Sequence, residues 1–167
     1  MKTIILLRHS YAKQKSDTGD IGRVLTKRGI KLAKLMSCEL KQRVKEVDLI
    51  VSSISVRTKE TAAIFKQKVF PEVNIKENKA LYRLYSADLF FDFVYELDSS
   101  YDTVLFVGHN PVFTSLAGYF TEQFAIYMHP ASFVIASFDV RSWTDINLLV
   151  VKNVIYVNSK IIEEQNQ

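Results

Sequence analysis

Short runs of branched and aromatic apolar residues recur along the chain, and they have the length and continuity of strands buried on both faces. They lie at residues 4–7, 49–51 and 104–107. Arg8 and His9 follow the first run, small serines follow the second, and His109 follows the third shortly after its last apolar residue. The pattern therefore predicts strands that deliver polar side chains to one edge of a sheet. In open α/β sheets, ligands bind at the carboxyl ends of the strands.

Between these runs, apolar residues recur at helical spacing, and polar residues stand where helix caps are expected. The predicted helices cover residues 27–45 with Thr26 as N-cap, a segment from Ser53 or Ser55 to just before Pro71, and residues 88–97. A further helix is predicted over residues 112–119, with Asn110 as its cap followed by a first-turn proline, Pro111. Residues 74–76 are expected to form a short strand, and residues 133–138 and 147–157 an antiparallel pair. Strands that alternate with helices are typical of an α/β fold.

A chain of 167 residues fits one domain that buries about two thirds of its unfolded surface. No internal repeat, low-complexity segment or linker divides it. We therefore expect a single domain over residues 1–158, followed by a polar carboxyl-terminal tail over residues 159–167.

Composition restricts the classes of function. The chain is 48% apolar and 24% charged, which are ordinary values for a globular protein, and its net charge is +4. This excess of positive charge suits an anionic substrate but is too small to indicate nucleic-acid binding. A lone cysteine, Cys38, excludes an internal disulfide and is consistent with a cytoplasmic location. No segment has the length of a signal-peptide core or a membrane span, so we expect no membrane partner.

The predicted sheet edge gathers two imidazoles and two guanidinium groups: Arg8, His9, Arg57 and His109. Arg57 falls in the first turn of its predicted helix, where a cation opposes the helix dipole unless it helps to bind an anion. The spacings typical of metal sites and of the serine-hydrolase elbow are absent, so we expect no metal and no cofactor. Arginines suit a phosphoryl group, and an imidazole can carry that group covalently.

Three segments resemble, in order and spacing, the signatures of the histidine phosphatase superfamily. They are Leu-Leu-Arg-His-Ser at 6–10, Ser-Ser-Ile-Ser-Val-Arg-Thr-Lys-Glu-Thr at 52–61, and Val-Gly-His-Asn-Pro at 107–111. Within the superfamily the chain is most similar to the SixA-type phosphohistidine phosphatases, through its length, residues 23–29, Leu81-Tyr82 and the His-Asn-Pro triplet. The resemblance extends from residue 3 to about residue 138.

This resemblance implies a three-layer α/β sandwich of the phosphoglycerate mutase type, with a mostly parallel central sheet, helices on both faces and no metal. It implies that His9 is the nucleophile and that Arg8, Arg57 and His109 form the phosphate pocket. We expect Ser10 and Arg23, which flank the polar loop over residues 11–22, to contact the substrate as well.

Two positions depart from the family pattern. Ser10 stands where the family usually has glycine, which would reduce the freedom of the loop after the nucleophile. Ile54 stands where proline is usual, at the entry to the second helix, and removes no catalytic atom.

The general acid is not evident in the sequence. Asp88 is the carboxylate in the region where larger relatives carry one, although its position also suits a helix cap. His129, beside Pro130, is a second candidate, and a surface histidine is the alternative interpretation.

Two classes of function therefore compete. One is a phosphatase, acting on a phosphorylated protein side chain such as phosphohistidine or on a small phosphomonoester, that works as a monomer. The other is a phosphate-binding module weakened in turnover by the change at Ser10. The presence of all four pocket residues favours the enzyme.

Overall fold

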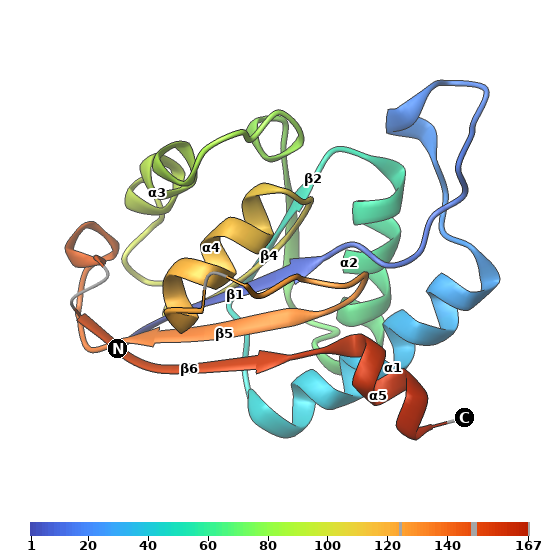
Figure 1. The fold of residues 1–167 in the computed structure, drawn as a ribbon. Helices are drawn as coiled ribbons and strands as arrows, with labels where there is room; N and C mark the ends of the chain where they lie inside the picture. The colour runs from blue at the N-terminus through green and yellow to red at the C-terminus, as the bar shows by residue number, and fades with distance from the viewer. Residues whose placement is uncertain (124, 148–149, 167) are drawn as a thin grey trace.

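A computed structural model describes residues 1–123, 125–147 and 150–166 and shows a central sheet covered by helices (Figure 1). In this part of the chain the sheet has six strands in the order β3-β2-β4-β1-β5-β6. The strands β3, β2, β4 and β1 run parallel, whereas β5 and β6 are antiparallel to their neighbours. Their bounds are β1 Lys2–Arg8, β2 Leu49–Ser53, β3 Asn74–Asn78, β4 Thr103–Gly108, β5 Phe133–Phe138 and β6 Val151–Val157.

Helices cover both faces of the sheet, as Figure 1 shows. On one face lie α1 (Lys27–Arg43), α2 (Val56–Val69) and the short α5 (Ser159–Gln165), and on the other lie α3 (Ala87–Tyr95) and α4 (Val112–Thr121). Single turns of 3₁₀ helix occur at η1 (Asp20–Gly22), η2 (Ala80–Tyr82) and η3 (Trp143–Asp145). The expected three-layer sandwich with a mostly parallel sheet is confirmed.

The central strand β1 has a continuous apolar run at residues 4–7, and its packing explains that run. Ile4 and Leu6 pack in the core beneath α3 and α4, while Ile5 and Leu7 pack in the core beneath α1 and α2. Successive side chains of a strand point to opposite faces, so a strand covered on both sides has no polar face. All four side chains are fully buried, and the first polar group of the run appears where the strand ends.

Most predicted helix starts agree with the structure. Thr26 Oγ1 accepts a hydrogen bond from Gly29 N at 3.0 Å, and Ser55, one of the two proposed residues, caps α2. The prediction that Asn110 caps its helix was wrong. Pro111 occupies the N-cap of α4, and the Asn110 side chain instead donates to the Met128 carbonyl at 3.1 Å.

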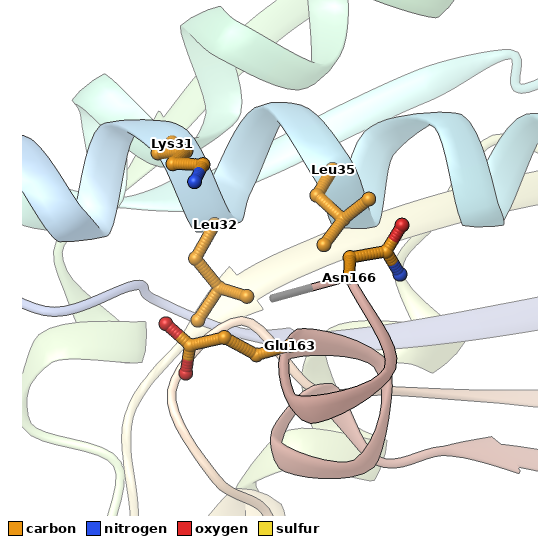
Figure 2. Close-up of a pocket in the computed structure, with 5 residues that line it drawn as sticks. All are labelled: Lys31, Leu32, Leu35, Glu163 and Asn166. Atoms are coloured by element: carbon orange, nitrogen blue, oxygen red, sulfur yellow. The ribbon is translucent and has the colours of Figure 1, made fainter.

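The carboxyl-terminal segment also differs from its prediction. The expected polar tail forms α5 over Ser159–Gln165, with Ser159 buried, and Gln167 lies outside the described residues. Figure 2 shows Leu32 of α1 pointing toward Glu163 of α5, and Leu35 of α1 lying next to Asn166. The pocket that these residues line has a volume of about 250 Å³. The predicted strand over residues 147–157 is observed from Val151, and residues 148–149 of that prediction lie outside the described residues. None of the helices described here is long and apolar enough to cross a membrane.

Candidate active site

A cavity of about 450 Å³ opens at the carboxyl ends of β1 and β4. The register of these parallel strands pairs Arg8 with Gly108, so His9 and His109, which follow them, are neighbours across the ladder. Their ring centroids lie 5.1 Å apart. The cavity is lined by Arg8, His9, Asp20, Arg23, Arg57, Tyr82, His109 and Asn110. The four pocket residues predicted from the sequence therefore come together.

His9 is held with a defined tautomer. Its Nδ1 lies 2.7 Å from the Ser10 carbonyl oxygen, and a carbonyl can only accept, so Nδ1 carries the proton. Nε2 is then left with its lone pair and accepts from Arg57 Nε at 3.3 Å. The backbone is fixed too, because His9 N donates to the Gly108 carbonyl at 3.1 Å. An unprotonated imidazole nitrogen is the form required of a nucleophile.

His109 is fixed from the opposite side of the cavity. Its Nδ1 lies 3.4 Å from Arg57 Nη2, and because a guanidinium can only donate, Nδ1 is the acceptor. Nε2 therefore carries the proton and donates to Ser53 Oγ at 2.9 Å. Ser53 ends β2, so three parallel strands contribute to the position of the two rings.

Burial keeps both imidazoles neutral. Loss of solvent lowers the pKa of His9 to about 3 and the pKa of His109 to about 4, and the neighbouring arginines act in the same direction. At neutral pH the positive charge of the cavity therefore resides on its guanidinium groups. The three arginines and the carboxylate of Asp20 give a net formal charge of +2, which matches a phosphoryl dianion.

Arg57 connects the parts of the cavity. It lies in the first turn of α2 and is 5% exposed. Its Nε and Nη2 face His9 and His109, while Nη1 donates to the Asp20 carbonyl at 2.6 Å and Nη2 donates to Asp20 Oδ2 at 2.8 Å. The sequence analysis expected a specific role for Arg57, because a cation in the first turn of a helix opposes the helix dipole. The partners on both edges of its guanidinium agree with that expectation.

Asp20, in η1, is the carboxylate of the cavity. Its Oδ1 accepts from Arg23 at 2.8 Å, and its Oδ2 accepts from the Tyr82 hydroxyl at 2.9 Å as well as from Arg57. These donors, Arg23 first among them, hold the pKa of Asp20 well below its usual range. Asp20 is therefore ionised at neutral pH and is not a proton donor in this state.

Arg8 forms the opposite wall. Its Nη1 donates to the Met128 carbonyl at 2.7 Å, and the guanidinium lies 5.5 Å from the Tyr127 ring centroid. The Nε of Arg8 is buried, and no described residue accepts a hydrogen bond from it. A buried donor without a protein partner is unfavourable, and Arg8 is among the residues that line the cavity.

Three predicted site residues lie elsewhere. Ser10 is buried, and its hydroxyl donates to the Gly29 carbonyl at 2.8 Å, so its side chain supports α1 and does not line the cavity. Asp88 is exposed on α3, whose cap is Ser86, and neither it nor His129 lines the cavity. His129 instead packs against the Tyr127 ring, with centroids 5.1 Å apart. Neither candidate for the general acid therefore lies at the cavity, where both were expected.

Asp20, Tyr82 and Asn110 line the cavity but were not predicted as site residues. The available signal for Asp20 was its position three residues before Arg23 in the polar loop, which the sequence places over the sheet edge. Tyr82 was part of the resemblance to the SixA-type phosphatases but was given no role in the site. No cluster of three or more His, Cys, Asp or Glu side chains that could hold a metal ion occurs within residues 1–123, 125–147 and 150–166.

The fold and the cavity define an α/β protein with two neutral imidazoles and three arginines at the carboxyl ends of parallel strands. Residues 4–81 match the sequence profile of the histidine phosphatase superfamily (branch 1). The match covers just under half of the chain, and over this part the chain is similar to that superfamily. A comparison with curated protein sequences gave no match.

Several solved structures share the fold of this chain. The protein histidine phosphatase SixA complexed with tungstate has a TM-score of 0.74 at 17% identity, covering 93% of this chain and 94% of that one. A SixA candidate from Nakamurella multipartitia has a TM-score of 0.73 at 23% identity, covering 92% and 95%. A mycobacterial glucosyl-3-phosphoglycerate phosphatase complexed with VO3 has a TM-score of 0.66 at 15% identity, covering 95% and 99%. At these identities the likeness establishes the fold.

Proposed function

We propose that this protein is a phosphatase that transfers a phosphoryl group from its substrate to Nε2 of His9 and then hydrolyses the phosphohistidine. The observation that carries the proposal is the hydrogen bond from His9 Nδ1 to the Ser10 carbonyl at 2.7 Å. It leaves the Nε2 lone pair in the cavity, on a ring that burial keeps neutral. A neutral, oriented imidazole can attack phosphorus without first losing a proton.

The arginines supply the electrostatic part of this proposal. Arg57 presents N–H groups beside His9 Nε2, and Arg8 presents a buried Nε without a protein acceptor in the described structure. Such donors are fixed before the reaction, so they stabilise the charge that develops on the transferring group without reorganisation. We assign Arg8, Arg57 and His109 to binding the phosphoryl oxygens and Arg23 to the mouth of the cavity.

The substrate that fits this site best is a phosphorylated protein side chain, in particular phosphohistidine. Expulsion of an alkoxide needs an acid, but Asp20, the carboxylate lining the cavity, is held ionised by Arg23 and Arg57. A phosphoramidate nitrogen can be protonated before its bond to phosphorus breaks, so it needs no such acid. The similarity in fold to the protein histidine phosphatase SixA supports the same assignment.

A small phosphomonoester is the second candidate, favoured by the similarity in fold to a glucosyl-3-phosphoglycerate phosphatase. The phosphate-binding module without turnover is disfavoured by Ser10 itself. Ser10 is absent from the residues with positive φ, so the family's usual glycine is not required at this position. The monomeric state of the protein, its cytoplasmic location and its lack of nucleic-acid binding stay predictions.

The test is to trap the covalent intermediate. Brief mixing with a radiolabelled phosphodonor, followed by denaturation, is expected to leave acid-labile and base-stable label on the wild type and none on His9→Ala. His129→Ala, whose ring lies outside the cavity, is the matched control and is expected to label normally. EDTA is expected to leave turnover unchanged. Turnover by His9→Ala at the wild-type rate would refute the mechanism.

A further inference from the structure

Among the residues that the structure describes, Asp20 is the one acidic side chain that lines the cavity, and its contacts suggest a defined task. We propose that Asp20 is a positioning residue that aims the guanidinium of Arg57 at the phosphoryl group on His9. The inference rests on the proposed function, because it concerns the orientation of a donor in that reaction. Asp20 itself touches neither reacting atom in this assignment.

The two edges of the Arg57 guanidinium face different partners. A guanidinium is planar, and its five N–H groups point in fixed directions, so a bond to one edge fixes the direction of the other. The end of the fork, formed by Nη1 and Nη2, binds Asp20. Nη1 donates to the Asp20 backbone carbonyl at 2.6 Å, and Nη2 donates to Oδ2 at 2.8 Å. The side edge, formed by Nε and Nη2, faces the nitrogens of His9 and His109 at 3.3 and 3.4 Å.

A phosphoryl group on His9 Nε2 would therefore meet the side edge of Arg57 and leave the end of the fork on Asp20. Bidentate binding along one edge is the geometry in which arginine recognises phosphate most strongly. Without Asp20, the end of the fork would have no fixed acceptor. Arg57 could then rotate and bind phosphate oxygens end-on, in a geometry that no longer follows the path of the transfer.

Asp20 is itself held in place by two further residues. The Tyr82 hydroxyl donates to Oδ2 at 2.9 Å, and the Tyr82 ring lies edge-on to His109 with centroids 5.6 Å apart. Arg23 donates from Nη1 to Oδ1 at 2.8 Å, and its Nε donates to the Lys13 carbonyl at 2.5 Å. The carboxylate is 52% exposed, so it owes its fixed position to these hydrogen bonds and not to burial.

This arrangement predicts a particular kinetic signature. Removing the carboxylate raises the positive charge of the cavity, which favours binding of the anionic substrate, but releases the donor that must act in the transition state. We therefore expect Asp20→Asn and Asp20→Ala to lower kcat by roughly tenfold or more, as misplacement of a reacting group does. We expect KM for an aryl phosphate not to rise. A residue that simply bound substrate would raise KM instead.

Asp17→Asn is the matched control, since Asp17 is exposed in the same loop and does not line the cavity. It is expected to keep wild-type kcat and KM. Tyr82→Phe, which removes one of the three side-chain donors to Asp20, is expected to lower kcat less than Asp20→Asn does. The melting temperature of each variant shows whether a loss of kcat reflects unfolding.

Nitrogen-15 NMR gives a readout of Arg57 that does not depend on turnover. In the wild type the Arg57 Nε–H signal is expected to be resolved and slowly exchanging, and in Asp20→Asn it is expected to broaden or exchange faster. Unchanged kcat, an unchanged Arg57 signal, or a raised KM at normal kcat would each overturn the proposal. A loss of kcat that merely follows a loss of folded protein would overturn it too.

The failure of the proposed function would look different. In that case the wild type would turn over no phosphorylated substrate. Calorimetric binding of tungstate, a phosphate-like oxyanion, would then replace kinetics. The positioning role would still predict a changed enthalpy of tungstate binding and a changed Arg57 signal in Asp20→Asn. Identical enthalpy and spectra would refute it independently of catalysis.

Discussion

The cavity at the carboxyl ends of the strands and the pocket between α1 and α5 both combine charged with less polar side chains, but they use charge differently. In the cavity, Arg57 is almost fully buried and bonded on both edges. At the α1–α5 pocket, Glu163 lies beside Leu32 and Leu35 (Figure 2). Its side chain is 16% exposed and pairs with Arg28, which is 60% exposed. The cavity encloses its central cation, Arg57, within the protein, whereas the cation at the pocket, Arg28, lies mainly in solvent.

The difference bears on what each region can do. A charge held in a low-dielectric surrounding acts strongly on a ligand and shifts the pKa of its neighbours, as His9 and His109 show. An exposed ion pair is screened by water and salt and has little influence beyond its own contact. Changes in the cavity should therefore alter the reaction by large factors, and changes in the α1–α5 pocket should alter stability slightly.

The largest expected effect concerns the leaving group. Proton donation by a positioned acid is typically worth about a hundred- to ten-thousandfold in rate. Because Asp20 is held ionised, we expect kcat/KM for a phosphohistidine peptide and an aryl phosphate to exceed that for an alkyl phosphate by a factor in this range. All three substrates are to be measured on one preparation. Similar values for the alkyl ester would show that an acid operates in the cavity.

The next effect concerns the donors to the phosphoryl group. Arg57→Ala and His109→Ala are each expected to lower kcat by about a hundredfold or more, because each removes a fixed group facing the developing charge. Lys34→Ala, at an exposed position on α1 outside the cavity, is the control and should keep normal turnover. Steady-state kinetics with an aryl phosphate measure all three. Near-normal turnover in either cavity variant would remove that residue from the reaction.

The same comparison explains how much the sequence alone could predict. Strand ends are encoded locally, because a run of buried apolar residues stops where the polar residue begins. Arg8, His9 and His109 could therefore be assigned to the sheet edge from the pattern, and parallel strands with a fixed register then bring them together. Arg57 was found the same way, through a helix cap following a strand.

Residues that reach the cavity from loops left no such signal. Asp20 and Tyr82 lie 62 positions apart in the chain, and their hydrogen bond depends on how two 3₁₀ turns fold over the sheet edge. Asp88 had the expected side chain at the expected point of the sequence, but α3 directs it to solvent. Loop geometry is set by tertiary contacts, so neither the presence of Asp20 nor the exclusion of Asp88 follows from periodicity.

The neutral histidines also predict an effect on stability. The pKa of His9 is about 3 in the folded protein and near 6.5 when exposed, so between these values the unfolded chain binds a proton that the folded chain does not. The free energy of unfolding of the wild type should therefore fall as the pH is lowered from 7 to 4.5. The slope from this group is at most about 1.4 kcal/mol per pH unit.

His9→Ala removes this contribution. The free energy of unfolding of His9→Ala minus that of the wild type should therefore rise as the pH is lowered from 7 to 4.5. Urea unfolding at several pH values measures the difference. A constant difference from pH 7 to 4.5 would mean that His9 takes up its proton equally in both states, and the picture of a cavity that keeps its imidazoles neutral would fail.

The smallest expected effect lies in the α1–α5 pocket. Arg28 binds Glu163 through both carboxylate oxygens, at 2.8 and 2.7 Å, and its guanidinium lies 4.2 Å from the Tyr11 ring centroid. Because Arg28 is largely exposed, we expect Glu163→Gln to reduce the free energy of unfolding by no more than about 1 kcal/mol, and less at high salt.

Tyr11 begins the loop that carries Asp20, so this pair also tests whether the two regions are coupled. Urea unfolding at low and high salt, with kcat for an aryl phosphate on the same samples, measures both effects. If charges in the α1–α5 pocket act only locally, kcat stays unchanged, whereas a severalfold fall in kcat would show that the ion pair reaches the cavity through Tyr11.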